Sequence, residues 1–343
     1  MIYAIRPECS AGLRTGAQLL KKNQDTGRRK PDSNALKTHK NGYFGLPPIP
    51  QSRKICHYIA VQLNYDTPSP LDYFTTLVAS DEHFPLLEAA ASIAQDEYPN
   101  LDVQQVLGDV DQLVARLKRR IPADALPIVR LRALNQFFYR DLSFAANVNN
   151  YYDPDNSYLN AVLKTRKGIP ISLAVIWLEV AQALGLNARG VSFPGHFMLK
   201  VTLPKGQVVI DPLDGQSLSR EDLGERLEPY KRRSGLVDDF DVPLGLYLQG
   251  AKPRDIVARM LRNLKEIHST QEDWPRLVAV LDRLIVLVPD HWSDWRDRGL
   301  AYAELGQIQR AVPDLEVYLS KADEGMDLDA IAERVAELRR AMN

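Results

Sequence analysis

The sequence predicts an α+β fold, with helices lying on an antiparallel sheet, followed by an all-α helical repeat. Three observations support this. Apolar residues recur at helical spacing over residues 70–145, short apolar or alternating runs follow a buried helix after residue 186, and a 34-residue pattern recurs after residue 253. Because 343 residues exceed one ordinary domain of roughly 100–200 residues, we expect two or three compact units.

The composition is that of a globular chain with substantial cores. A net charge of −1, with 25% charged and 45% hydrophobic residues, excludes a wholly disordered chain, a collagen-like repeat and a globally basic nucleic-acid binder. The two cysteines, Cys9 and Cys56, are too few for a disulfide framework or a four-ligand zinc site. No run of about 18 apolar residues and no secretory signal pattern occurs. We therefore expect a cytoplasmic protein with no membrane partner, no metal and no cofactor.

Residues 1–60 are expected to form a basic, poorly ordered extension. Within residues 1–55, eleven Lys and Arg stand against three Asp and Glu, which gives +8 and leaves −9 for the rest of the chain. Few apolar positions are periodic there, and the segment ends in the Pro-rich stretch 46–50. Contact of this tail with nucleic acid is the alternative interpretation.

Residues 70–145 are predicted to be helical. Pro70 opens the first helix, and apolar residues continue at helical spacing over residues 84–98. Asp102 is a suitable N-cap for a third helix that ends near residue 120, and residues 126–139 form the next.

Residues 146–215 combine a polar loop, a helix and a sheet. Residues 147–160 are rich in Asn, Asp and Tyr, which favour a loop that hydrogen-bonds its own backbone. An apolar helix follows from Ile171 to a stop signal at Gly185. Three strands are then predicted, at residues 188–193, 196–203 and 207–210, with a hairpin turn between the last two. We assign residues 70–215 to one domain.

Residues 216–250 are predicted to be a mixed connector, and residues 253–343 a helical repeat. A shift of 34 residues superposes Leu261 on Trp295, His268 on Tyr302 and Leu281 on Leu315. That period, together with Gly299, Tyr302, Gly306 and Ala311, is the tetratricopeptide pattern. Two copies and a final helix are about the minimum for a stable solenoid.

His196 and Asp211 are the leading candidates for a functional pair. His196 begins one predicted strand and Asp211 follows the end of the next, so the hairpin places them side by side. A His held by an Asp can act as a base for a nucleophile at a helix N-terminus. A purely structural strand histidine is the alternative.

Several motifs resemble one known family. They are Arg166-Lys-Gly-Ile-Pro-Ile-Ser-Leu-Ala174, Ala183-Leu-Gly-Leu-Asn-Ala-Arg189, Pro194-Gly-His-Phe-Met-Leu199, Val209-Ile-Asp-Pro212, the loop 147–160 and Arg298-Gly-Leu-Ala-Tyr302. The sequence is similar to bacterial SirB-type proteins, which join a transglutaminase-like domain to C-terminal tetratricopeptide repeats. The resemblance covers roughly residues 70–340. It implies a papain-like core of helices on an antiparallel sheet, and it suggests a role in regulating gene expression or protein turnover.

The sequence departs from this family at the nucleophile. The catalytic Cys of such domains stands fifteen positions before the Gly that ends its helix, and counting back from Gly185 gives Pro170. Ser172 is the nearest hydroxyl, but two residues of helix correspond to about 200° of rotation, so it should point away from His196. Neither Cys9 nor Cys56 lies at the start of an apolar helix, where a thiol pKa would be lowered.

The sequence therefore favours a non-catalytic domain that acts as a protein-binding or regulatory scaffold through its cleft and its repeats. A protein or peptide partner is expected on the repeats, with aromatic anchors at Trp292, Trp295, Tyr302 and Tyr318. Repeat packing is the alternative role for these side chains. The alternative function is a hydrolase or an acyl or amide transferase, in which His196 is the base, Asp211 orients it, and Ser172 or an activated water attacks.

Overall fold

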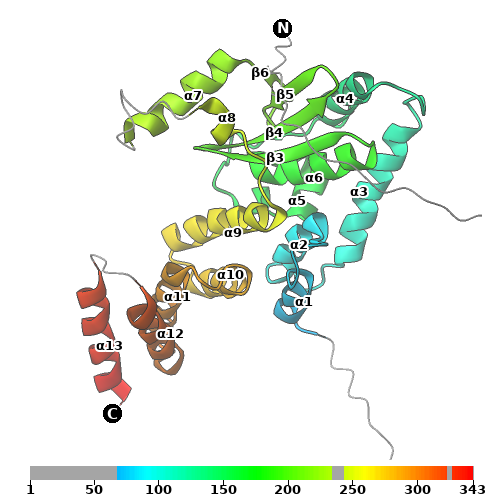
Figure 1. Cartoon of the computed structure of the whole chain (residues 1–343). Coiled ribbons are helices and arrows are strands. Elements are labelled where there is room, and N and C mark those ends of the chain that lie inside the picture. Colours follow the sequence, from blue (N-terminus) through cyan, green and yellow to red (C-terminus); the bar gives the residue numbers. More distant parts are fainter. Residues whose placement is uncertain (1–67, 234–242, 323–326, 343) are drawn as a thin grey trace, which may run out of the picture. The chain divides into compact units, whose positions relative to one another are not determined.

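The structure is a computed structural model of the chain, and it describes residues 68–233, 243–322 and 327–342 (Figure 1). The predicted basic extension and both cysteines lie outside these residues. No helix in the described part is both long enough and apolar enough to cross a membrane.

The predicted N-terminal helices are present. They are α1 (Pro70–Leu77), α2 (Leu86–Ser92) with a short 3₁₀ turn (Ile93–Gln95), α3 (Val103–Lys118) and α4 (Pro127–Asn135), which continues as a π-helical turn (Gln136–Asp141). Local signals explain where they start. The Ser69 hydroxyl accepts a hydrogen bond from the Asp72 N–H, and the Asp102 carboxylate accepts one from the Gln104 N–H.

The centre of the first domain is α6 (Pro170–Ala183), a helix buried along nearly all of its length. It packs on a four-stranded antiparallel sheet in the order β3 (Asn187–Phe193), β4 (His196–Leu203), β5 (Gly206–Ile210) and β6 (Ser217–Leu218). The three predicted strands and the hairpin turn are confirmed, because Leu203 pairs directly with Gly206. The mixed fold of helices on an antiparallel sheet is therefore the observed one.

Several elements were not predicted. They are the short parallel pair β1 (Ala145–Ala146) and β2 (Lys167–Gly168), the 3₁₀ turn Pro154–Asn156, α5 (Leu159–Thr165), β6, α7 (Arg220–Arg233) and α8 (Leu244–Tyr247). The predicted connector 216–250 thus contains two helices and a strand. On the sheet face away from α6, Leu223 and Leu227 of α7 pack with Val191, Phe193 and Met198 in a second, smaller core.

The repeat region contains α9 (Pro253–Thr270), α10 (Trp274–Leu287), α11 (Trp292–Glu304), α12 (Ile308–Lys321) and α13 (Leu328–Met342). Each helix packs on the next, and Figure 1 shows the succession from α9 to α13. Gly299 allows the close approach of α11 and α12, because a Cβ atom there would lie 2.7 Å from Leu315 Cγ.

One apolar core runs from the N-terminal helices through α6 into the repeats, with Phe74, Trp177 and Leu315 among its members. Polar contacts cross the same junction. Arg254 of α9 donates to the Val78 carbonyl oxygen at 2.6 Å, and buried Arg283 of α10 is paired with Asp96. The domain boundaries near residues 215 and 253 stay a prediction, which hydrogen exchange can test.

Candidate functional site

A polar loop forms one rim of the site. Its Asn and Asp side chains bond to one another and to the loop backbone. Asn147 donates to Asn156 Oδ1 at 3.0 Å, and buried Asn156 donates to the carbonyl oxygens of Asn150 and Tyr151 at 2.7 and 3.1 Å. This self-bonded loop agrees with the prediction. It holds Tyr151 and Tyr152, which are 48% and 70% exposed, in edge-to-face contact with their ring centroids 5.6 Å apart.

His196 and Asp211 are within hydrogen-bond reach, as their places on adjacent strands predicted. His196 Nε2 lies 3.0 Å from Asp211 Oδ1. Because an ionised carboxylate only accepts, Nε2 carries the proton and donates. The other ring nitrogen, Nδ1, has no hydrogen-bond partner among the described residues.

Arg226 completes this arrangement, and the sequence did not predict it. Its Nη1 lies 2.7 Å from Asp211 Oδ2. Burial raises the pKa of Asp211, but hydrogen bonds from His196, from the Leu213 N–H and from Arg226 outweigh this and lower the pKa to about 2. Asp211 is therefore an ionised anchor for the His196 and Arg226 side chains and for the Leu213 N–H. Arg226 lies on α7, a polar helix that was not predicted from the sequence.

The His196 side chain, 20% exposed, opens into a cleft of about 230 Å³. Residues from four parts of the chain line this cleft: the loop residues Tyr151 and Tyr152, the start of α6 at Ile169, Pro170 and Ile171, the start of β4 at Gly195, His196 and Phe197, and the α9 residues Arg259, Asn263, Glu266 and Ile267. The α9 residues recur at helical spacing, so one face of the first repeat helix closes the cleft. Sequence reasoning placed α9 in the repeat and did not predict this second role.

Pro170 and Ser172 have different positions relative to His196. Pro170 is the first residue of α6 and lines the same cleft as His196, and its assignment to the nucleophile position stays a prediction. Ser172 is completely buried. Its hydroxyl donates to the Asn156 carbonyl oxygen at 2.6 Å and accepts from the Ile169 N–H at 3.1 Å. Ser172 therefore does not hydrogen-bond to His196. Its hydroxyl connects the polar loop that carries Tyr151 and Tyr152 to the start of α6.

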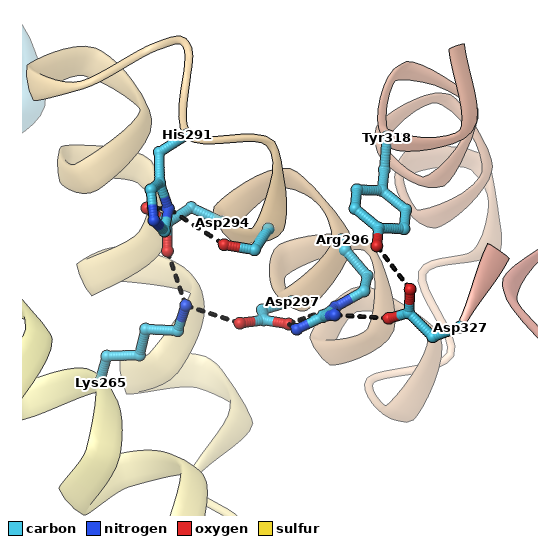
Figure 2. Close-up of polar contacts among 8 residues, drawn as sticks. Lys265, His291, Asp294, Arg296, Asp297, Tyr318 and Asp327 are labelled. Atoms are coloured by element: carbon cyan, nitrogen blue, oxygen red, sulfur yellow. Dashed lines mark hydrogen bonds and ion pairs between the residues drawn. The ribbon is translucent and has the colours of Figure 1, made fainter. Parts of the chain in front are cut away.

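The repeat carries its own polar network, shown in Figure 2. Lys265 of α9 is 2.6 Å from carboxylate oxygens of both Asp294 and Asp297 of α11, and Asp294 is completely buried. Arg296 contacts Asp297 at 2.8 Å and Asp327 at 2.5 Å. These bonds connect α9, α11 and the segment that leads into α13, so the repeat helices are held in register by charge as well as by packing.

Two of the four predicted aromatic anchors are buried in the packing of the repeat. Tyr302 and Tyr318 are only 3% and 7% exposed, and the Tyr318 hydroxyl donates to Asp327 at 2.6 Å. These two rings have little free surface for a partner, because they fill the space between the repeat helices. Trp292 and Trp295 are partly exposed, although the Trp295 indole N–H donates to the Pro289 carbonyl oxygen at 3.1 Å.

No group of three or more His, Cys, Asp or Glu side chains is placed to hold a metal ion within the described ranges. The candidate site is therefore a cleft with a His–Asp–Arg array, an apolar floor and two exposed tyrosines. It contains a potential base and an orienting carboxylate.

The chain is similar to known protein families and to individual bacterial proteins. A transglutaminase-like superfamily description matches residues 104–262, and a tetratricopeptide repeat description matches residues 264–336, so the two meet inside α9. The chain is 39% identical over 259 residues to a UPF0162 protein of Xylella fastidiosa strain Temecula1, covering 75% of this chain and 91% of that protein.

More distant relatives carry the same family description. A UPF0162 protein of Pseudomonas aeruginosa is 30% identical over 258 residues, covering 74% of this chain and 90% of its own. UPF0162 protein YchA of Escherichia coli K12 is 29% identical over 252 residues, covering 73% and 88%. Among solved structures, menin aligns over 77% of this chain and 72% of its own with 11% identity and a TM-score of 0.35, values too low to indicate a shared fold.

Proposed function

This chain belongs to the UPF0162 family of SirB-type, transglutaminase-like proteins, and on that basis we propose that it is a non-catalytic, protein-binding scaffold of the cytoplasm with a regulatory role. The transglutaminase-like cleft is kept for binding, and the tetratricopeptide repeats dock a protein or peptide partner.

One observation carries the proposal: among the described residues, no hydroxyl or thiol hydrogen-bonds to His196. Nucleophilic catalysis needs a hydroxyl or thiol within about 3.2 Å of the base. The side chain of Pro170, at the start of α6, has only carbon atoms beyond the backbone and cannot act as a nucleophile. Ser172 is buried, and its hydroxyl is engaged by Asn156 and Ile169. The His196–Asp211 pair is thus retained in a cleft where the described part of the chain supplies neither Pro170 nor Ser172 as a nucleophile.

The construction of the cleft also supports binding. Its α9 wall belongs to the repeat, and its mouth carries the exposed rings of Tyr151 and Tyr152. Exposed aromatic rings beside a cleft are typical of recognition surfaces. A partner docked on the repeat is therefore close to a cleft that one repeat helix helps to form. Of the four proposed anchors, Trp292 and Trp295 have surface left for this docking.

The alternative is a hydrolase or an acyl or amide transferase in which His196 activates a water. The 3.0 Å contact between His196 and Asp211 favours it, because Asp211 fixes the ring and leaves Nδ1 free to accept a proton. Such an enzyme would change its partner covalently, whereas a scaffold would only hold it.

Photo-crosslinking tests the proposal. A photoreactive phenylalanine is placed in the full chain at Tyr152, at Trp292 or, as a control, at the partly exposed Tyr230 of α7, and cells that express each variant are irradiated. We expect one protein to be captured from both Tyr152 and Trp292 and not from Tyr230. Capture of no protein, or of the same mixture from all three positions, would overturn the proposal.

A further inference from the structure

We propose that Arg259 makes the cleft a binding site for a carboxylate group carried by a peptide. The inference rests on the proposed function and deepens it, because it names the chemistry that the cleft recognises. It starts from a charge inside the cleft that lacks a counter-ion.

Arg259 lies on the face of α9 that closes the cleft. Its Nη1 donates to the Phe193 carbonyl oxygen at 3.3 Å, and its guanidinium lies 5.6 Å from the centre of the Phe197 ring. Among the described residues, no carboxylate oxygen lies within 4.0 Å of it. Arg226 and Arg298, by contrast, are paired with carboxylates.

Burying half of a charged guanidinium without a counter-ion costs free energy, because the group loses hydration. Burial lowers the pKa of Arg259, with a smaller opposing effect from Tyr151, although the group stays protonated at neutral pH. Arg226 is balanced by Asp211, so it does not compete for a ligand. Arg259 thus offers its remaining N–H donors, and an uncompensated positive charge, to whatever enters the cleft.

The neighbouring groups favour a carboxylate over a phosphate. A planar guanidinium matches a carboxylate with two parallel hydrogen bonds. Glu266, exposed on the same wall of α9, adds a negative charge that opposes a dianion more than a monoanion. Asn263, one turn from Arg259, can donate a further hydrogen bond.

The apolar part of the cleft indicates what carries the carboxylate. Ile169, Pro170 and Phe197 are buried apolar residues that line the cleft, together with the exposed rings of Tyr151 and Tyr152. The cleft has a volume of about 230 Å³. This suits one apolar side chain with an adjacent carboxylate. The carboxylate comes either from a chain end or from an Asp or Glu side chain.

Three peptides distinguish these sources: N-acetyl-Ala-Leu-Phe with a free C-terminus, the same peptide as its C-terminal amide, and N-acetyl-Asp-Leu-Phe amide. The full chain is labelled at the δ1 methyls of isoleucine, and Ile169, Ile171 and Ile267 report on the cleft by NMR. We expect one of the two carboxylate peptides to bind with a Kd about tenfold or more below that of the neutral amide. Whichever binds tighter identifies the source.

Variants assign the effect to Arg259. Arg259→Gln should raise the Kd of the carboxylate peptide to that of the neutral amide, and Arg259→Lys, which keeps the charge without the planar fork, should give an intermediate Kd. Arg262→Gln, on the exposed side of the same helix, is the matched control and should change nothing. Melting curves show whether each variant is folded, and the Lys variant serves if the Gln variant is not.

The results that would overturn the inference are distinct from those that would overturn the scaffold. Equal binding of acid and amide, equal effects of Arg259→Gln and Arg262→Gln, or no shift of the cleft methyls by any peptide at millimolar concentration would each remove the role of Arg259. Crosslinking from Tyr152 could then still support the scaffold. Covalent turnover of a partner would remove the scaffold and leave carboxylate recognition intact.

Discussion

Pro170 and His196 line the same cleft, and each is the first residue of its element, α6 and β4. The first turn of a helix lowers the pKa of a thiol, and so does a neighbouring imidazole. Pro170→Cys, made in a background in which Cys9 and Cys56 are replaced by Ser, should therefore give a thiol with a pKa well below the usual value of about 8.5. The rate of alkylation by iodoacetamide, followed as a function of pH, measures it.

The control for this prediction is internal. Adding His196→Ala to the same variant keeps the helix start and the access to the cleft but removes the imidazole, so the thiol pKa should rise by about one unit or more. Pro253→Cys, at the first position of α9, reports the effect of a helix start elsewhere. Identical pH profiles with and without His196 would mean that position 170 does not face the histidine.

Asp211 should make stability depend on pH in a defined window. Its folded-state pKa of about 2 lies below the ordinary value of about 3.9, so its contribution is present above about pH 4 and is lost as the pH falls towards 2. Asp211→Asn should lower the free energy of unfolding by about 2 kcal/mol at pH 7, and the difference should shrink towards zero near pH 2. Urea titrations at several pH values measure this. Asp290→Asn, at an exposed position, should show no such trend.

Replacement by Ala should lower the free energy of unfolding at Gly299 and raise it at Gly108. A Cβ at Gly299 would lie 2.7 Å from Leu315 Cγ and 3.1 Å from the Ala311 carbonyl oxygen, so Gly299→Ala should overpack α11 against α12 and cost roughly 1–3 kcal/mol. At Gly108, inside α3, nothing lies within 4 Å, so Gly108→Ala should stabilise the protein by about 0.4–1 kcal/mol. Thermal or urea unfolding of the two variants measures both changes in the free energy of unfolding.

The Gly299 variant also tests the domain boundary by hydrogen exchange. Because α9 and α10 contact the N-terminal helices through Arg254 and Arg283, we expect faster exchange in α11–α13 with protection kept in α9, α10 and residues 70–215. Faster exchange throughout the chain would mean that the repeat and the first domain open as one cooperative unit.

The adjacent carboxylates of Asp96 and Glu97 should differ strongly in their contribution to the free energy of unfolding. Asp96 pairs with Arg283, whose side chain is 2% exposed, so Asp96→Ala leaves a buried charge unpaired and should cost about 3–5 kcal/mol. Glu97 pairs with Arg276, which is half-exposed and keeps its contact with Asp273, so Glu97→Ala should cost under about 1 kcal/mol. Similar losses for the two variants would contradict this account of the junction.

The sequence predicted the elements whose residues carry strong local signals. The Pro70 and Asp102 helix starts, the strands around His196 and the helix behind Pro170 all follow from capping residues, turn residues and periodicity. The His196–Asp211 contact followed because hairpin pairing is local in the chain. The short helix α5 was missed because it adjoins a polar loop, and α7 because Leu223 and Leu227 are its only buried residues.

The rest of the site depends on contacts between distant segments. Arg226 reaches Asp211 from a helix that covers the far face of the sheet, and Arg259 reaches the cleft from the first repeat helix. Helical periodicity predicts that α9 has a buried face, but it does not predict which surface that face closes. Trp292, Trp295, Tyr302 and Tyr318 were recognisable by pattern, whereas the burial of Tyr302 and Tyr318 required the packed structure.

Intact-mass spectrometry of the partner captured from Tyr152 tests the central claim, binding without chemistry, most directly. The purified partner is incubated with the wild-type protein, with the His196→Ala variant or with buffer alone, and its mass is recorded over time. A scaffold predicts the same mass in all three samples, together with a stoichiometric complex. Cleavage, deamidation or an acyl-transfer adduct that forms with the wild-type protein and not with His196→Ala would contradict the claim and establish His196 as a catalytic base.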